Sequence, residues 1–234
     1  MKKGQVFNRK EIKYVITKHQ KEDLVEYMQN YMVKDKYSDK NIISVYIDTP
    51  SKRLIRNSME KPMYKEKLRI RSYGVANDSS EVFMEIKKKF KGIVYKRRVS
   101  MSCDDANCYL KGKNLDGGQV LKEVDYLKQV YGNLEKSMYM SYYREAYKCL
   151  EDEHLRVTFD SDVVARVEDI SLTSEIYGHN ILDENLVIME IKTLYGFPEW
   201  LNYFLSNNKI YKTPFSKYGK AYKDLVLNQG GEIC

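Results

Sequence analysis

The sequence contains few of the side chains on which covalent and zinc-dependent catalysis rests. It has three histidines, His19, His154 and His179, and none lies near a serine, cysteine or carboxylate in a recognisable triad spacing. Its four cysteines include no pair with C-x-x-C spacing. The phosphate-binding motif GxxxxGK[ST] does not occur either. These absences argue against a hydrolase triad and a zinc site, and they exclude a Walker-type nucleotide site.

Long apolar segments and linker-like segments are also missing. No stretch of 18 apolar residues occurs, and the N-terminus MKKGQVFNRK has no apolar core of the kind that a signal peptide needs. There is no linker rich in proline, glycine or serine, and no repeat of fixed length. We therefore expect a soluble, reduced, cytoplasmic protein without a transmembrane segment, in which residues 1–234 form a single domain.

The sequence is rich in charge and in tyrosine. Charged residues make up 31% of the chain, the net charge is +7, and there are 21 tyrosines. An excess of positive charge suits phosphate-rich partners, namely nucleic acid, nucleotides, polyphosphate or an anionic membrane. Tyrosine has an apolar ring and a polar tip, which suits strands that are buried on one side and wet on the other.

Most of the chain is predicted to form short strands. These segments are rich in valine, isoleucine, tyrosine and phenylalanine, they are bounded by turn residues, and Gly92 signals a hairpin between two of them. The predicted strands are Arg9–Thr17, Ile42–Asp48, Tyr64–Tyr73, Glu81–Phe90, Ile93–Ser102, Met138–Tyr147, Leu155–Ala165 and Leu186–Leu194. Helical spacing predicts helices at Lys18–Met32, Ser51–Met59, Gln119–Tyr131, Pro198–Leu205 and Ser216–Leu227, and loops are expected at Asn107–Gln119 and Tyr177–Asn185.

Charge alternates with aliphatic residues along these strands. Glu85 and Lys87 share one face of their strand, and Arg69 and Arg71 share one face of another, because residues i and i+2 point the same way. The opposite faces are aliphatic and must be covered, which the predicted helices can do. This pattern predicts an α+β fold: an eight-stranded antiparallel β-barrel tunnel with a charged lumen and helices packed outside.

The charged faces have more than one interpretation. A single alternating strand is most often a solvated face with cross-strand ion pairs. The basic runs at Lys87–Lys89 and Lys96–Arg98 could bind nucleic acid, and Asp160 and Asp162 could bind a metal or pair with arginines. Repeated over many strands, a few glutamates among many cations favour a site for a metal ion and a triphosphate.

Several motifs, in their order along the chain, resemble one known family. They are RKEIKYVI, SVYIDTP, YKEKLRIRSYG, VFMEIKKKF, VYKRRV, SYYREAY, LRVTFDSDV, VIMEIKTLYGFPEWL and FSKYGKAY. Together they resemble the catalytic domain of the vacuolar transporter chaperone (VTC) polyphosphate polymerases, in a bacterial stand-alone form. That family belongs to the triphosphate tunnel metalloenzymes, which are related to the CYTH proteins. The resemblance extends from Phe7 to about Leu227.

The resemblance implies a phosphotransferase that moves the γ-phosphoryl group of ATP onto a growing polyphosphate chain and releases ADP. It implies a Mn²⁺ or Mg²⁺ cofactor, held by Glu190 with Glu85 and Glu11 as helpers, and it implies that Asp160 and Asp162 orient basic residues. Residues at matching motif positions would hold phosphates: Lys13, Arg69, Arg71, Lys87, Lys96, Arg144, Arg156 and Lys217. Further substrate contacts are expected from Arg9, Arg98, Lys192, Lys212, Ser216 and Lys220.

The sequence departs from the family pattern at one position. The family leads us to expect a lysine just before Phe-Ser-Lys, but Pro214 stands there and Lys212 is the nearest substitute. The expected partners are ATP and inorganic polyphosphate or triphosphate, with no specific nucleic acid and with a membrane-protein partner if the chain is coupled to a membrane. Two alternatives stay open: a tripolyphosphatase or nucleoside-triphosphatase on the same tunnel, and a non-enzymatic module that binds polyphosphate or nucleic acid.

Overall fold

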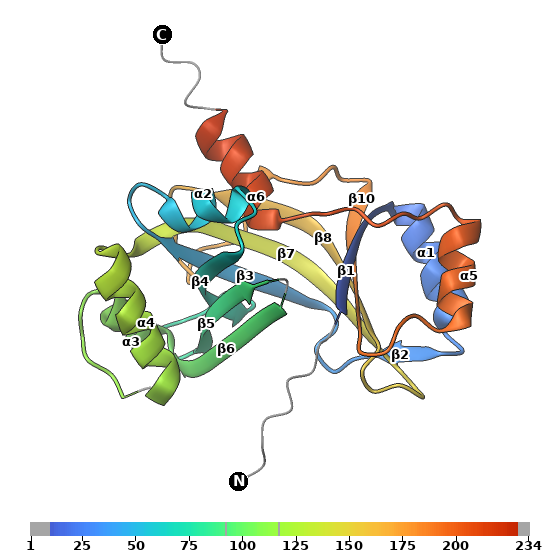
Figure 1. Cartoon of the computed structure of the whole chain (residues 1–234), viewed down its shortest axis with the longest axis horizontal. Coiled ribbons are helices and arrows are strands. Elements are labelled where there is room, and N and C mark those ends of the chain that lie inside the picture. The colour runs from blue at the N-terminus through green and yellow to red at the C-terminus, as the bar shows by residue number, and fades with distance from the viewer. Residues whose placement is uncertain (1–9, 92, 117, 229–234) are drawn as a thin grey trace. The chain divides into compact units, whose positions relative to one another are not determined.

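The computed structural model describes residues 10–91, 93–116 and 118–228, as a succession of strands and helices (Figure 1). The strands are β1 (Lys10–Thr17), β2 (Met32–Lys34), β3 (Lys40–Asp48), β4 (Tyr64–Tyr73), β5 (Glu81–Phe90), β6 (Ile93–Ser102), β7 (Glu135–Cys149), β8 (Arg156–Arg166), β9 (His179–Asn180) and β10 (Leu186–Thr193). The helices are α1 (Lys18–Met28), α2 (Arg53–Met59), α3 (Cys103–Leu110), α4 (Gly118–Tyr131), α5 (Glu199–Asn207) and α6 (Lys217–Tyr222), and α6 continues into a π-helical turn, Lys223–Leu227.

The strands form one sheet, and every pair whose register is described is antiparallel. The hydrogen-bonded order is β1-β10-β8-β7-β3-β4-β5-β6, with β2 beside β7 and β9 beside β8. The predicted antiparallel sheet is confirmed, but the prediction of an eight-stranded closed barrel is wrong. The sheet has ten strands, and within the described residues its end strands, β1 and β6, are not paired with each other.

Strand number and closure could not be predicted from the alternation of residues, for two physical reasons. Strands β2 and β9 are three and two residues long, which is too short for an alternating pattern to be visible. Whether the ends of a sheet meet depends on strand tilt and stagger, which are properties of the whole sheet.

The chain divides into two compact units. Of the described residues, unit 1 contains 10–40, 143–162 and 182–216, and unit 2 contains 41–142, 163–181 and 217–228. Strands β7 and β8 each begin in one unit and end in the other. The expectation of a single domain stays a prediction.

In unit 1, helices α1 and α5 lie side by side (Figure 1) and cover aliphatic residues of the sheet. Leu24 of α1 and Leu201 of α5 are fully buried with Val157 and Ile191 of the strands. Helix α1 begins with a capping box, in which Thr17 and Gln20 each accept a hydrogen bond from the backbone of the other.

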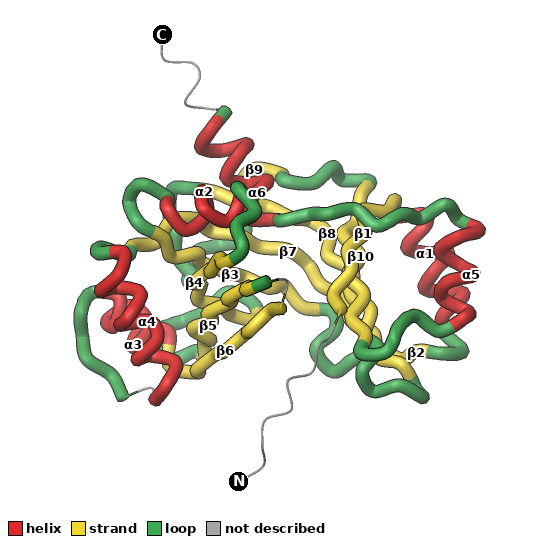
Figure 2. The backbone as a smooth tube through the Cα atoms, viewed as in Figure 1, coloured by secondary structure: helices red, strands yellow, loops and turns green. Residues whose placement is uncertain are grey.

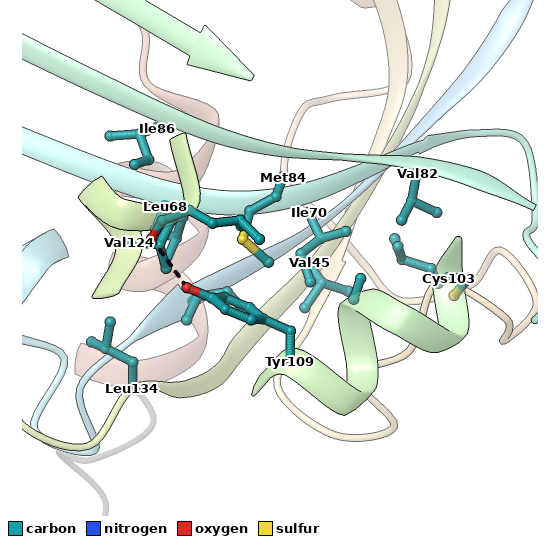
Figure 3. Close-up of a cluster of buried hydrophobic side chains, with 14 of the residues drawn as sticks. Val45, Leu68, Ile70, Val82, Met84, Ile86, Cys103, Tyr109, Val124 and Leu134 are labelled. Atoms are coloured by element: carbon teal, nitrogen blue, oxygen red, sulfur yellow. Dashed lines mark hydrogen bonds between the residues drawn. The ribbon is translucent and has the colours of Figure 1, made fainter. Parts of the chain in front are cut away.

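In unit 2, helices α3 and α4 lie together (Figure 2) and pack on the aliphatic faces of the strands. Figure 3 shows Leu68, Ile70 and Met84 of β4 and β5 in this cluster, with Tyr109 of α3 and Val124 of α4. The prediction that helices cover the aliphatic side of the sheet is therefore confirmed within each unit.

Most strand boundaries agree with the predictions, but the helix predicted at Lys18–Met32 ends at Met28, and Met32 begins β2. The predicted loop at residues 107–119 overlaps helix α3, which begins after Ser102 because that side chain accepts a hydrogen bond from the backbone of Asp105. Gly92 lies outside the described residues, but the pairing of Phe90 with Ile93 confirms the hairpin. Among the helices that the structure describes, none is long and apolar enough to cross a membrane.

Candidate active site

The charged faces predicted from the sequence are aligned with one another by the strand register of unit 2. Across β4, β5 and β6 the paired residues form rows, and each row contains one residue from each of the three strands. One row contains lysines alone, and the next contains two arginines on either side of a glutamate. The rows are Lys67–Lys87–Lys96 and Arg69–Glu85–Arg98.

Glu85 is the centre of the charged cluster in unit 2. Its side chain is 1% exposed, and its Oε2 accepts from Arg69 Nε at 2.8 Å and lies 2.7 Å from Arg69 Nη2. Arg71 Nη2 lies 3.5 Å from the same oxygen, and Lys96 Nζ lies 2.8 Å from Oε1. We call Glu85, Arg69, Arg71 and Lys96 the Glu85 cluster.

The cations of this cluster keep Glu85 ionised in spite of its burial. Burial raises the pKa of the carboxyl group, but Arg69 and Lys96 outweigh it and lower the pKa below its ordinary value. Burial also lowers the pKa of Arg69, and Tyr46, Glu85 and Tyr142 more than reverse that effect. Three cations around one buried carboxylate leave an excess of positive charge on this face, which suits an anion.

Helix α6 brings a further lysine to unit 2. Lys217 Nζ lies 4.5 Å from the ring centroid of Tyr142, one of the groups that raise the pKa of Arg69. The next residue, Tyr218, stacks on Tyr46 with ring centroids 4.0 Å apart. The hydroxyl of Tyr218 also donates to Oδ2 of the fully buried Asp48 at 3.1 Å. These contacts fix α6, and with it Lys217, against β3.

Glu190 is the centre of the charged cluster in unit 1. It faces Lys13 across the β1–β10 pair, with Oε2 3.6 Å from Lys13 Nζ, and its Oε1 lies 2.6 Å from Lys192 Nζ. Lys13 Nζ also lies 3.9 Å from Glu11 Oε1 and donates to the carbonyl oxygen of Phe215 at 3.3 Å. We call Glu190, Lys13, Lys192 and Glu11 the Glu190 cluster.

Arg144 adds charge to this side of unit 1. Burial raises the pKa of Glu190, but Lys192, Lys13 and Arg144 outweigh burial and hold the pKa well below its ordinary value. Arg144 is itself oriented by the fully buried Asp160, whose two oxygens accept from its Nε and Nη2 at 2.6 and 2.7 Å. Asp160 thus contacts a basic residue as expected, whereas Asp162 is exposed and accepts from Ser161.

The remaining predicted residues are placed less centrally. Arg156 Nη1 lies 3.7 Å from the buried Asp35, and its side chain is 49% exposed. Lys220 pairs with Asp224 one turn further along the helix. Lys212 and Ser216 are exposed in the segment before α6. Arg9 lies outside the described residues.

The basic runs considered for nucleic acid contain two residues on the aliphatic side of the sheet. Lys88 and Arg97 both pair with Glu123 of helix α4. Arg97 interrupts the predicted alternation, and this ion pair accounts for it because the residue meets a helix instead of the charged face.

The candidate metal ligands differ in their fit to a divalent cation. Within the described part of the chain, no group of three or more His, Cys, Asp or Glu side chains is placed to hold a metal ion by protein ligands alone. Glu85 is 1% exposed and is engaged by two arginines and a lysine, so it fits poorly. Both oxygens of Glu190 are also engaged, but by lysines, whose single mobile charges can turn away. Glu190 and Glu11 both approach Lys13, and Mg²⁺ is often held by one or two carboxylates together with substrate phosphates. This pair therefore fits such an ion, with phosphate oxygens completing the coordination.

Sequence reasoning missed three residues that order these clusters, namely Tyr46, Asp48 and Tyr218. All three lie inside motifs that were noticed, SVYIDTP and FSKYGKAY, but they carry no alternating charge. An uninterrupted apolar strand that ends in Asp-Thr-Pro could have indicated that the aspartate caps the next helix.

Comparisons with known proteins agree with this fold. The family model described as the VTC domain matches residues 8–226. A proposed adenylate cyclase from Bacillus halodurans has a similar structure, with 15% identity over 89% of this chain and 95% of that one, and a TM-score of 0.56. A second one, from Vibrio parahaemolyticus, has 10% identity over 92% of this chain and 98% of that one, and a TM-score of 0.51.

Two further results complete the comparison. The Mimivirus capping enzyme triphosphatase is 10% identical, with coverage of 85% of this chain and 87% of that one and a TM-score of 0.32, too low to support an argument. No curated protein matches the chain. At these identities the two cyclase structures show the fold alone.

Proposed function

Because this chain belongs to the VTC domain family, we propose that it is a metal-dependent polyphosphate polymerase. It transfers the γ-phosphoryl group of ATP to a growing polyphosphate chain and releases ADP. The family membership and the fold support an enzyme of the triphosphate-tunnel type. The polymerase activity is the part that we propose.

The observation that carries the proposal is the state of Arg71 in the Glu85 cluster. Its side chain is 9% exposed, and its Nε is buried without a hydrogen-bond partner among the described residues. A buried donor of this kind costs about 1–3 kcal/mol when it is left unsatisfied. A phosphate oxygen would accept from it, and Arg69 and Lys96 lie around the same carboxylate to share the charge.

The proposed reaction asks the protein mainly for positioning and charge. Phosphoryl transfer needs the attacking and leaving oxygens roughly in line, with charge spread over the transferred group. In unit 2, Arg69, Arg71 and Lys96 would bind phosphate oxygens while Glu85 holds the guanidinium groups in place. In unit 1, Arg144, held by Asp160, would bind phosphate as a planar fork.

Lysines and a metal ion would have separate roles. Lys13 and Lys192 are single mobile charges and can turn from Glu190 towards phosphate oxygens. A bound Mn²⁺ or Mg²⁺, held by Glu190 and Glu11, would supply neutralisation of the charge on the phosphates. The ionised state of Glu190 is the state that such an ion requires.

Product analysis tests the proposal directly. The purified protein is incubated with ATP and Mn²⁺, and the products are separated on a gel stained for polyphosphate while ADP and orthophosphate are measured. Long chains with one ADP per phosphate added are expected. Orthophosphate without chains would contradict the polymerase and favour a tripolyphosphatase or nucleoside-triphosphatase that uses water as acceptor.

A matched pair of variants separates an enzyme from a binding module. Glu190→Gln removes the proposed metal ligand and is expected to lower turnover at least about 100-fold. Glu184→Gln makes the same change at an exposed loop position of the same unit and should keep wild-type turnover. Equal turnover in the two variants would remove Glu190 from the reaction. Salt-dependent binding of polyphosphate without any turnover in the wild type would instead favour a basic module that only binds polyphosphate.

A further inference from the structure

The charged face of unit 2 contains an aromatic ring. Phe83 lies on the same face of β5 as Glu85 and Lys87, and it pairs with Arg71 of β4. Alternation places charge at the neighbouring positions of this face. The hydrophobic core of the unit, in which Met84 is buried, lies on the opposite face. The ring therefore belongs to the charged side of the sheet and not to the core.

Two side chains surround this ring. Tyr73 meets Phe83 edge to face, with ring centroids 5.8 Å apart and planes at 79°, and it is 37% exposed. The guanidinium of Arg98 lies over the Phe83 ring, 4.7 Å from its centroid. We call Tyr73, Phe83 and Arg98 the aromatic group.

The aromatic group continues the rows of the charged face. Arg98 belongs to the row that contains Arg69 and Glu85, and Phe83 stands in the next row beside Arg71. Tyr73 follows Arg71 by two residues, so it lies one further row along. Successive rows are about 7 Å apart, because each is two residues of a strand. The aromatic group thus overlaps the rows of the Glu85 cluster, and Tyr73 extends it by one row.

The opposite end of the face has a different composition. There the row is made of Lys67, Lys87 and Lys96, one from each strand. Lysines bind phosphate as mobile point charges and offer a base no ring on which to stack. The two ends of this face therefore differ. One end carries aromatic rings and a guanidinium group, and the other carries a row of lysines.

We propose that the aromatic group is the subsite for the purine base of the nucleoside triphosphate, while the lysine row takes phosphate units of the chain. The proposal rests on the proposed function. Bases stack on aromatic rings and on guanidinium planes, and such stacking is tolerant of sequence because every base has a π-face. Polyphosphate has no ring, so this group distinguishes the nucleotide from the polymer.

Binding measurements with two ligands test the inference. Dissociation constants are measured for ATP and for inorganic tripolyphosphate by calorimetry, in the wild type and in Phe83→Leu, which removes the ring and keeps apolar volume. We expect Phe83→Leu to raise the Kd of ATP about tenfold, as expected for the loss of one stacked base. The Kd of tripolyphosphate should change less than about twofold.

Two further variants test whether the loss of ATP binding is specific to the aromatic group. Tyr73→Leu should weaken ATP binding in the same direction, and both variants are checked by thermal unfolding and circular dichroism. Phe90→Leu is the matched control: it lies on the same strand, is 43% exposed and has Lys91 over its ring. Since Phe90 faces the other side of β5, its substitution should leave both dissociation constants unchanged.

The outcomes separate the subsite from the proposed reaction. A selective loss of ATP binding supports the subsite even if the product assay shows hydrolysis instead of polymerisation. An equal loss for both ligands in Phe83→Leu, or no loss for ATP, would overturn the subsite even if long chains are made. A wild-type protein that binds neither ligand would overturn both proposals.

Discussion

At the scale of single residues, the most informative feature is a pair of buried carboxylates that stay ionised. Glu85 and Glu190 are each surrounded by cations, which outweigh the cost of burial and lower both pKa values. Each carboxylate therefore stabilises its own group of cations and leaves a net positive charge on its unit. A polyanionic substrate would meet that charge.

The lowered pKa of Glu190 predicts a loss of stability in acid. Since the folded pKa lies below the ordinary value of 4.5, the contribution of the carboxylate is complete above that pH and is lost as the pH falls below it. Urea unfolding at several pH values from about 6 to 3 should show a smaller acid loss in Glu190→Gln than in the wild type. Glu184→Gln should follow the wild type, and parallel curves for all three proteins would contradict the prediction.

The ion pair of Arg69 with Glu85 predicts a second stability difference. Arg69→Met leaves a carboxylate that is 1% exposed with one close cation fewer, and we expect a loss of about 3 kcal/mol. Arg97→Met breaks the pair with Glu123 at a side chain that is 54% exposed, and should cost less than about 1 kcal/mol. Equilibrium unfolding in urea measures both, and similar losses would show that the burial of Glu85 is unimportant.

At the scale of elements, helix α2 depends on a side chain that precedes it. The residue at its N-cap, Lys52, has a left-handed backbone and makes no side-chain cap. Instead Asp48, at the end of β3, accepts from the backbone N–H groups of Leu54 at 2.8 Å and Ile55 at 3.0 Å. The same carboxylate accepts from the hydroxyl of Tyr218 in α6. One buried aspartate therefore joins β3, α2 and α6.

Removing this carboxylate should be more costly than removing an ordinary cap. Asp48→Ala leaves the N–H groups of Thr49, Leu54 and Ile55 without this acceptor and takes one of two partners from the buried Tyr218 hydroxyl, and we expect a loss of about 2–3 kcal/mol. Ser102→Ala removes the single cap bond of α3 and should cost about 1 kcal/mol. Chemical unfolding of the two variants compares them, and an equal cost would mean that Asp48 acts only as a helix cap.

At the scale of the whole molecule, the binding of polyphosphate and the turnover of ATP are expected to depend on different charges. The net charge of +7 predicts attraction of polyphosphate that weakens as salt screens it. If a divalent ion takes part only in the reaction, its removal should separate the two properties.

Removal of metal should stop turnover and spare polymer binding. With EDTA present, we expect polyphosphate formation from ATP to cease, while fluorescently labelled polyphosphate still binds in an anisotropy assay. Raising NaCl from about 50 to 300 mM should weaken that binding at least tenfold. Loss of polymer binding on addition of EDTA would contradict this division, and restored turnover on adding Mn²⁺ or Mg²⁺ in excess is the control.

The sequence by itself determined the local character of the strands. Alternation along β4, β5 and β10 separates charged from aliphatic faces, because the direction of side chains in a strand depends only on neighbours two residues apart. Helix periodicity likewise predicted α1, α4 and α5, whose apolar residues face the sheet. These patterns were enough to predict the antiparallel sheet with helices on its aliphatic side.

Only the tertiary structure decided which charges meet. The pairing of Arg69 with Glu85 and of Lys13 with Glu190 comes from strand register, and the cap that Asp48 gives to α2 comes from a contact outside the helix. The ten-strand order and the unpaired ends among the described residues are also long-range properties. Local patterns determine the face of the strand on which a side chain lies. The partner of that side chain comes from a segment distant in sequence. Such segments pair only when the contacts of the whole fold outweigh the entropy lost in closing the loop between them.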